Sequence, residues 1–153
     1  MQRLETFVPP PVVAAITAVL MWLGAAAGAG ASAGWPLRLG LALAVAFAGA
    51  AIAVTGARTF KRARTTLDPR QPRKASSLVT GGIYRVTRNP MYLGLTCVLL
   101  GLALWLWWWP VLAGPMLFVT YITRFQIGPE ERALAAAFGA QYEAYCRRVR
   151  RWL

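Results

Sequence analysis

The stretch GGIYRVTRNPMYLG, from Gly81 to Gly94, is polar and basic and runs directly into a long apolar segment. Two adjacent acids, Glu130 and Glu131, stand at the far end of the apolar sequence that follows. The segment between them, 95–127, reads as a hairpin of two apolar helices, and a short connection makes such helices antiparallel. The sequence therefore predicts that the basic stretch and the two acids meet at one face of a membrane.

The composition indicates a membrane protein. Hydrophobic residues make up 58% of the 153 residues, charged residues make up 14%, and the mean hydropathy is +0.47. A soluble domain of this length has too much surface for its volume to bury so many apolar side chains, so lipid must cover part of them. The chain has 17 Lys and Arg against 5 Asp and Glu. Membrane topology explains this excess, and we expect no nucleic-acid partner.

Four apolar segments predict an all-α membrane protein with about four transmembrane helices, in a single domain over residues 1–153. Each segment approaches the ~20 residues that a helix needs to cross the hydrocarbon core. They are residues 11–28, 37–57, 91–109 and 111–127. All basic residues except Arg38 then fall on one side, so the positive-inside rule places both termini in the cytoplasm. The alanine-rich composition is typical of a bacterial chain, so we expect the bacterial inner membrane.

Residues 130–152 predict a final amphipathic helix that lies on the cytoplasmic face or folds back over the bundle. Pro129 and the acids beside it are ordinary helix-start residues. Apolar side chains recur on one side of this helix: Leu134, Phe138, Tyr142, Tyr145, Val149 and Trp152.

The second apolar segment carries a candidate packing face and ends in a basic stretch. Gly40, Ala44, Ala48 and Ala51 have the spacing that suits close helix contact in lipid, although the abundance of alanine explains the same spacing equally well. The stretch 58–74 predicts a basic interfacial helix that breaks into an extended loop at its prolines.

The ordered motifs of residues 80–153 resemble the isoprenylcysteine carboxyl methyltransferase and phospholipid methyltransferase families of small integral-membrane enzymes. The family pattern is G-x-Y-R, then R-H-P-x-Y-x-G at the start of a span, then E-E and F-G-x-x-Y-x-x-Y before a basic end. The corresponding residues here are Gly82 to Arg85, Arg88 to Gly94, Glu130-Glu131, Phe138-Gly139, Tyr142 and Tyr145. Asn89 stands where the family has His. Asparagine can position a ligand by hydrogen bonding but cannot titrate near neutral pH.

The resemblance implies a methyltransferase that uses S-adenosyl-L-methionine and acts at the cytoplasmic face. The implied substrate is lipophilic, with a carboxylate, thiol or amine head group, and the other expected partners are membrane lipids, anionic ones in particular. Methyl transfer from a sulfonium depends on proximity and alignment more than on acid–base groups, so a chain with no His is compatible with it. With no His and only two Cys, a transition-metal site is not expected.

Within this resemblance, Arg88, Glu131 and Arg148 are the expected catalytic residues. Arg88 suits the carboxylate of the methyl donor, Glu130 or Glu131 suits its ammonium group, and Arg148 suits an anionic substrate head group. The expected cofactor-binding residues are Gly82, Tyr84, Arg88, Asn89, Tyr92, Leu93, Gly94, Glu130 and Glu131. Taken alone, Glu130 is better explained as a helix-start acid.

Two other interpretations remain open. The segment from Tyr142 to Cys146 is similar to the ending of sterol reductases, which would imply an NADPH-dependent membrane enzyme. A non-enzymatic four-helix accessory protein whose basic face binds anionic lipid is the other. Binding of S-adenosylhomocysteine, of NADPH or of neither distinguishes the three.

Overall fold

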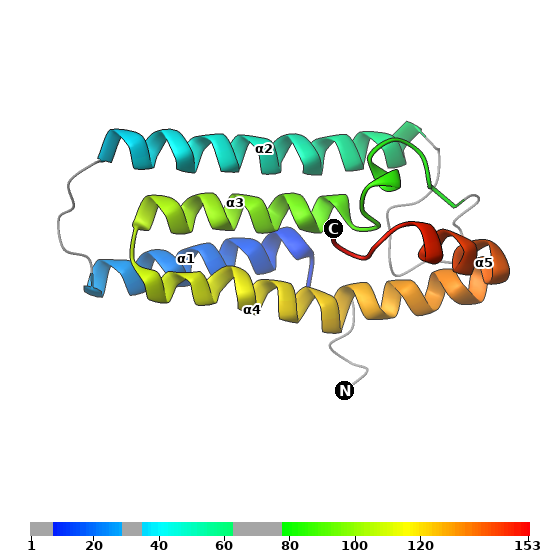
Figure 1. The fold of residues 1–153 in the computed structure, drawn as a ribbon. Coiled ribbons are helices and arrows are strands. Elements are labelled where there is room, and N and C mark those ends of the chain that lie inside the picture. Colours follow the sequence, from blue (N-terminus) through cyan, green and yellow to red (C-terminus); the bar gives the residue numbers. More distant parts are fainter. Residues whose placement is uncertain (1–7, 29–34, 63–77) are drawn as a thin grey trace.

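The computed structural model describes residues 8–28, 35–62 and 78–153, and the regular elements in these ranges are all helices. The first helices, α1 to α4, lie side by side and alternate in direction along the chain (Figure 1). They are α1 (Pro10–Gly28), α2 (Trp35–Arg62), α3 (Pro90–Leu106) and α4 (Ala113–Ile122). The predicted all-α class is confirmed. Most of the basic 58–74 stretch lies outside the described residues.

α4 continues into the last helix through a π-helical turn, η5 (Thr123–Ile127), and α5 (Gly128–Arg148) follows without a break (Figure 1). The Gly128 N–H bonds to the Thr123 carbonyl, five residues back, which defines the wide turn. The predicted separate helix beginning at residue 130 is therefore wrong. A proline ring clashes with the carbonyl four residues earlier in an α-helix, and the wider turn before Pro129 accommodates it.

The predicted continuous amphipathic helix over 130–152 is also wrong. Gly139 has φ 47° and ψ −124°, a conformation that glycine tolerates because it has no Cβ, and the chain kinks there. α5 ends at Arg148, and Val149 is extended. The apolar side chains nevertheless gather across the kink, where a buried cluster contains Tyr142, Tyr145 and Val149 with Leu78, Leu134, Phe138 and Cys146 around it.

The far end of the bundle differs slightly from the prediction. α3 ends at Leu106 rather than Trp109, because Trp107 takes a left-handed conformation (φ 49°) and η4 (Trp109–Leu112) reverses the chain. The Arg38 guanidinium lies 5.8 Å from the ring centroids of both Trp105 and Trp107. This cation–π contact accounts for the isolated basic residue at the end opposite the other basic residues that the structure describes.

Glycines allow α2 and α3 to pack closely. A Cβ added at Gly94 would overlap the Gly49 carbonyl oxygen, and one at Gly101 would lie 2.7 Å from the Ala42 carbonyl oxygen. The predicted face with Gly40, Ala44, Ala48 and Ala51 is wrong, since a Cβ at Gly40 meets nothing within 4 Å and the three alanines are exposed. Small residues occur on every side of this apolar helix, so spacing alone does not select the contact face.

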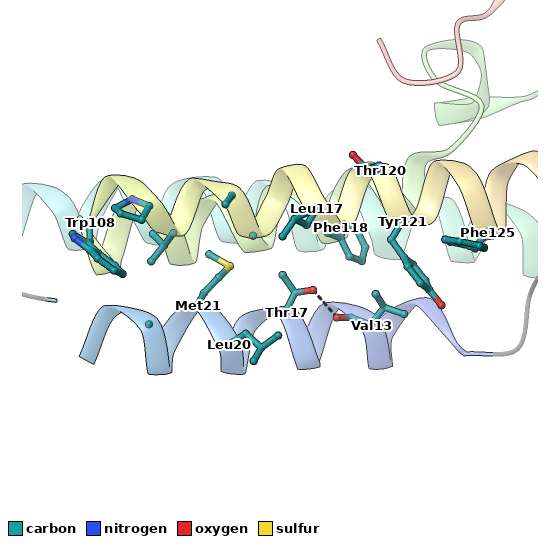
Figure 2. A pocket seen from close by; sticks show the side chains of 15 residues that line it. Val13, Thr17, Leu20, Met21, Trp108, Leu117, Phe118, Thr120, Tyr121 and Phe125 are labelled. Carbon is teal, nitrogen blue, oxygen red and sulfur yellow. Dashed lines mark hydrogen bonds between the residues drawn. The ribbon is translucent and has the colours of Figure 1, made fainter. Parts of the chain in front are cut away.

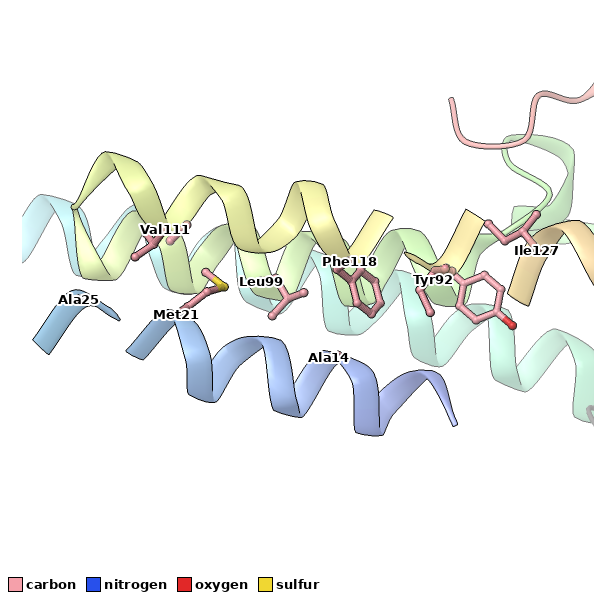
Figure 3. Close-up of a cluster of buried hydrophobic side chains, with 10 residues drawn as sticks. Ala14, Met21, Ala25, Tyr92, Leu99, Val111, Phe118 and Ile127 are labelled. Carbon is pink, nitrogen blue, oxygen red and sulfur yellow. The ribbon is translucent and has the colours of Figure 1, made fainter. Parts of the chain in front are cut away.

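The core lies between α1, α3 and α4 (Figure 3). Leu99, Phe118 and Ile127 are almost completely buried in it. Large apolar side chains also point outward, such as Phe47 at 69% and Met116 at 70% exposed, and extended apolar surfaces of this kind mark contact with lipid or another partner. Among the described residues, α2 alone is both long and apolar enough to cross a membrane.

Candidate functional site

The basic stretch and the acids meet at one end of the bundle, as the hairpin predicts. η3 (Gly82–Arg85), the start of α3, α5 and the chain after Arg148 all lie there (Figure 1). The Arg88 N–H donates to the Arg150 carbonyl (3.0 Å). The Arg151 carbonyl accepts hydrogen bonds from Asn89 Nδ2 (2.9 Å) and Thr87 Oγ1 (3.3 Å). These bonds fix the last residues against the start of α3.

Glu131 lies at the centre of an ion cluster. Its Oε1 accepts a hydrogen bond from Arg151 Nε (3.0 Å), and its Oε2 accepts one from Arg151 Nη2 (2.6 Å). Arg88 Nη2 lies 3.3 Å from the same Oε1. Two guanidinium groups therefore share one carboxylate, and the cluster has a surplus positive charge that suits an anionic group.

Arg88 makes further contacts inside the site. Its Nη1 donates to the Tyr142 hydroxyl (3.4 Å) and to Cys146 Sγ, both on α5 beyond the kink. Burial raises the pKa of Tyr142 above its usual value, so this hydroxyl stays protonated. Within the described chain, Arg88 Nε is buried and has no hydrogen-bond partner. A buried donor without a partner is costly, which points to a missing acceptor.

Glu130 has different surroundings from its neighbour. The Tyr92 hydroxyl donates to Glu130 Oε1 (2.6 Å), and Gln126, which is 3% exposed, lies beside that hydroxyl. Burial raises the pKa of Glu130 to about 7, because it outweighs the lowering effect of the Tyr92 hydrogen bond. Near neutral pH this carboxyl can therefore hold or release a proton.

Tyr84 is buried in the η3 turn. Gly82, with φ 58°, allows this turn, and the Tyr84 ring contacts Phe60 of α2 edge-on at 5.3 Å. The Tyr84 carbonyl accepts a hydrogen bond from the Tyr145 hydroxyl (2.7 Å). Burial raises the pKa of Tyr84, and the Tyr84 hydroxyl is buried with no partner in the part of the chain that the structure describes.

Not all the predicted site residues lie at this cluster. Arg88, Asn89 and Glu131 come together, and Tyr92 and Glu130 form a second pair beside them. Arg148 is exposed and donates to the Ala144 carbonyl of its own helix (3.3 Å), and Leu93 is partly buried. Gly94 packs against α2.

Sequence reasoning missed several side chains in the site: Arg151, Cys146, Thr87 and Gln126. Arg151 differs in no visible way from Arg147, Arg148 and Arg150 in the same basic tail. Its position follows from the kink at Gly139. The glycine of the Phe138-Gly139 motif is the one signal that could have indicated the kink.

An apolar groove of about 530 Å³ lies between α1 and α4 (Figure 2). It extends along α4 from Trp108 to Phe125, which is inside the η5 turn that leads to the two acids. The other labelled side chains that line it include Thr17, Met21, Leu117, Phe118 and Tyr121. The groove thus runs from the far end of the bundle, at Trp108, towards the end that carries the polar site.

Comparison with known proteins gives this arrangement a family. Residues 37–141 match the phospholipid methyltransferase family, and since this is more than half of the chain, the protein belongs to that family. The resemblance found in the motifs is confirmed. Membership implies methyltransferase activity in general, and together with the apolar α2 helix it indicates membrane association. The matched residues end before Tyr142, so the contacts made by the tail lie beyond them.

One curated relative is an uncharacterized protein of Haemophilus influenzae (strain ATCC 51907 / DSM 11121 / KW20 / Rd). It is 43% identical over 63 residues, which are 41% of this chain and the whole of that protein. No solved structure matches this chain.

Proposed function

We propose that this protein is an S-adenosyl-L-methionine-dependent methyltransferase that modifies a lipophilic substrate at the cytoplasmic face of the bacterial inner membrane. The ion cluster formed by Arg88, Glu131 and Arg151 is the observation that carries the proposal. Family membership supports methyl transfer in general. The assignment of S-adenosylmethionine as the methyl donor rests on how well the ion cluster suits this cofactor.

The charged side chains of the cluster fit the amino-acid end of S-adenosylmethionine, which has one carboxylate and one ammonium group. Arg88 Nε, which has no partner among the described residues, can donate to the carboxylate, and the cluster's surplus positive charge favours this carboxylate. Glu131 offers its carboxylate to the ammonium group. The Tyr84 hydroxyl, which is buried without a partner in residues 8–28, 35–62 and 78–153, can bond the edge of the adenine. When bound, the cofactor supplies an electrophilic methyl group.

The protein's own residues bind and orient in this scheme. Arg88 and Glu131 hold opposite charges of the cofactor, and Arg151 fixes Glu131 through two hydrogen bonds. Positioning of this kind can supply a large part of the rate acceleration for a transfer with an intrinsically reactive donor. Arg148, exposed on the last turn of α5, is available to an anionic head group.

The groove between α1 and α4 supports a lipophilic acceptor. Its apolar walls suit a hydrocarbon chain, and its end at Phe125 lies five residues before Glu130. A chain in the groove would bring its head group towards the polar site. In this proposal α1, α2, α3 and the α4 helix cross the membrane.

The deciding experiment measures ligand binding to the full chain purified in detergent. We expect S-adenosylhomocysteine to bind and NADPH not to bind, and we expect transfer of a labelled methyl group from S-adenosylmethionine to an alkyl acceptor. Binding of NADPH alone would replace this proposal with a reductase. Binding of neither ligand would leave a non-enzymatic accessory protein.

The proposed topology predicts opposite accessibility for the two connections of the chain. In a variant with Cys97 and Cys146 replaced by alanine, a single cysteine introduced at position 33 should react with a membrane-impermeant reagent added outside the cell. A single cysteine at position 66 should react only after the membrane is opened, because the basic residues segregate to that side. Equal labelling of both positions from outside would contradict the four-span arrangement.

We expect Asn89 to support cofactor binding indirectly, by holding the C-terminal residues in place. Its Nδ2 holds the Arg151 carbonyl, so Asn89→Leu should weaken S-adenosylhomocysteine binding and methyl transfer by about 2- to 10-fold, the value of one ordinary hydrogen bond. Asn89→His keeps a donor and should retain activity. Equal activity in Asn89→Leu and the wild type would show that the tail needs no such bond.

A further inference from the structure

The adjacent acids Glu130 and Glu131 are held by different partners. Both oxygens of Glu131 accept hydrogen bonds from Arg151, and Arg88 approaches one of them. Glu130 Oε1 instead accepts from the Tyr92 hydroxyl, which is 7% exposed at the start of α3. The two carboxylates are therefore equipped for different tasks, with Glu131 locked as a charged partner.

Polar groups from several elements of the described chain lie near Glu130. Tyr84 approaches from η3 and Tyr92 from α3, while Gln126 lies beside the Tyr92 hydroxyl from η5 and Glu131 is its neighbour on α5. Tyr84 is 4% exposed, and in the described chain its buried hydroxyl has no partner. A buried hydroxyl without a partner, close enough to Glu130 to interact with it electrostatically, leaves room near this carboxyl for a polar group of a ligand.

We propose that the Glu130 carboxylate is the base that takes the proton from a protic methyl acceptor, a thiol or an amine, and that the Tyr92 hydroxyl positions it. This inference rests on the proposed function. The acceptor heteroatom forms its bond to the methyl carbon while the methyl–sulfur bond breaks and leaves its electron pair on sulfur. The proton of the acceptor passes to an oxygen of Glu130.

The acceptor class follows from this proton. Methylation of a thiol, or of an amine that is bound as its ammonium ion, must release a proton, and a site packed against apolar helices offers few places for it. A carboxylate acceptor is already ionised and needs no base. The pKa of Glu130, raised by burial to about 7, matches the value at which a base works best near neutral pH.

The test compares Glu130→Gln with Glu143→Gln, a matched change at an exposed acid of the same helix. The acceptors are N-dodecanoyl-cysteine amide, dodecylamine and dodecanoate, which share one chain and differ in the head group. At pH 7, Glu130→Gln should slow transfer to the thiol and the amine by about 100- to 10,000-fold. Binding of S-adenosylhomocysteine should change little, and Glu143→Gln should behave as the wild type.

The pH dependence gives a second signature. Near pH 9 the thiol acceptor ionises by itself, since a cysteine thiol has a pKa of about 8.5, so Glu130→Gln should recover transfer to the thiol and recover far less to the amine, whose pKa is about 10.4. Tyr92→Phe removes a hydrogen bond that lowers the pKa of Glu130, so this pKa should be higher in the variant. The rise of the transfer rate with pH should therefore occur at a higher pH in Tyr92→Phe than in the wild type.

A readout independent of activity is thermal unfolding. A carboxyl whose pKa is raised in the folded protein stabilises it while protonated, and this contribution is lost as the pH rises through about 7. The thermal-unfolding midpoint of the wild type should therefore fall, relative to that of Glu130→Gln, as the pH rises through about 7.

Three results would contradict the role of Glu130 as the base. One is full transfer to the thiol and the amine by Glu130→Gln at pH 7, and another is wild-type activity confined to dodecanoate. Loss of S-adenosylhomocysteine binding in Glu130→Gln would make Glu130 a cofactor ligand instead. A wild type that binds no S-adenosylhomocysteine would refute the proposed function itself, and that result is seen before any acceptor is added.

Discussion

Glu131→Ala and Arg88→Ala are each expected to weaken S-adenosylhomocysteine binding by about 10- to 150-fold. Loss of one charged hydrogen-bonded partner costs about 1.5–3 kcal/mol, which corresponds to this range of affinity. In Glu131→Ala the guanidinium groups of Arg88 and Arg151 would also face each other without the carboxylate between them. Isothermal titration of the detergent-purified variants measures the effect directly.

Matched controls separate this effect from loss of charge in general. Glu143→Ala and Arg147→Ala remove exposed charges from the same helix and should leave affinity unchanged. Arg151→Ala should cost less than Arg88→Ala, because the Arg151 side chain is 43% exposed and exposed ion pairs contribute at most about 1 kcal/mol. If both Arg88→Ala and Glu131→Ala bound S-adenosylhomocysteine with wild-type affinity, this cluster would not be the cofactor-binding site.

Gly94→Leu is expected to abolish folding of the helix pair, and Gly94→Ala to destabilise it by about 1–3 kcal/mol. A Cβ at this position overlaps the Gly49 carbonyl oxygen and lies 2.7 Å from the backbone nitrogen of Ala53. Backbone atoms cannot rotate away as a side chain can, so α2 and α3 must separate. Thermal unfolding in one detergent gives the ranking of the variants.

The control for Gly94 is Gly40→Ala. A Cβ at Gly40 meets nothing within 4 Å, so this substitution on α2 should be neutral or stabilising by up to about 1 kcal/mol through helix propensity. If Gly94→Ala kept full stability but lost S-adenosylhomocysteine binding, Gly94 would contact the cofactor rather than α2.

The helices and the meeting of Arg88 with Glu131 could be predicted from the sequence, because both depend on features that are local in the chain. Long apolar runs bounded by proline and glycine determine the helices, and a hairpin of two such runs must return to its starting end. The family motifs then identify which polar residues are brought back.

The remaining contacts depend on geometry that hydropathy does not encode. The side of α2 that meets α3 is decided by Gly49, which looks like any other small residue of an alanine-rich helix. Arg151 reaches Glu131 because Gly139 reverses the chain, and a helical periodicity carried through that glycine places the tail on the wrong side. Glu130 and Glu131 have different hydrogen-bond partners, and this difference likewise arises from the surrounding elements.

The π-helical turn η5 acts as an angular spacer for the two acids. A helix advances by about 100° for each residue, and a π turn holds one residue more than an α turn. Removing a single residue from η5 would therefore swing Glu130 and Glu131 about 100° around the helix axis, away from Tyr92 and Arg88. The aim of both carboxylates is thus set by the count of residues in a turn that contains neither of them.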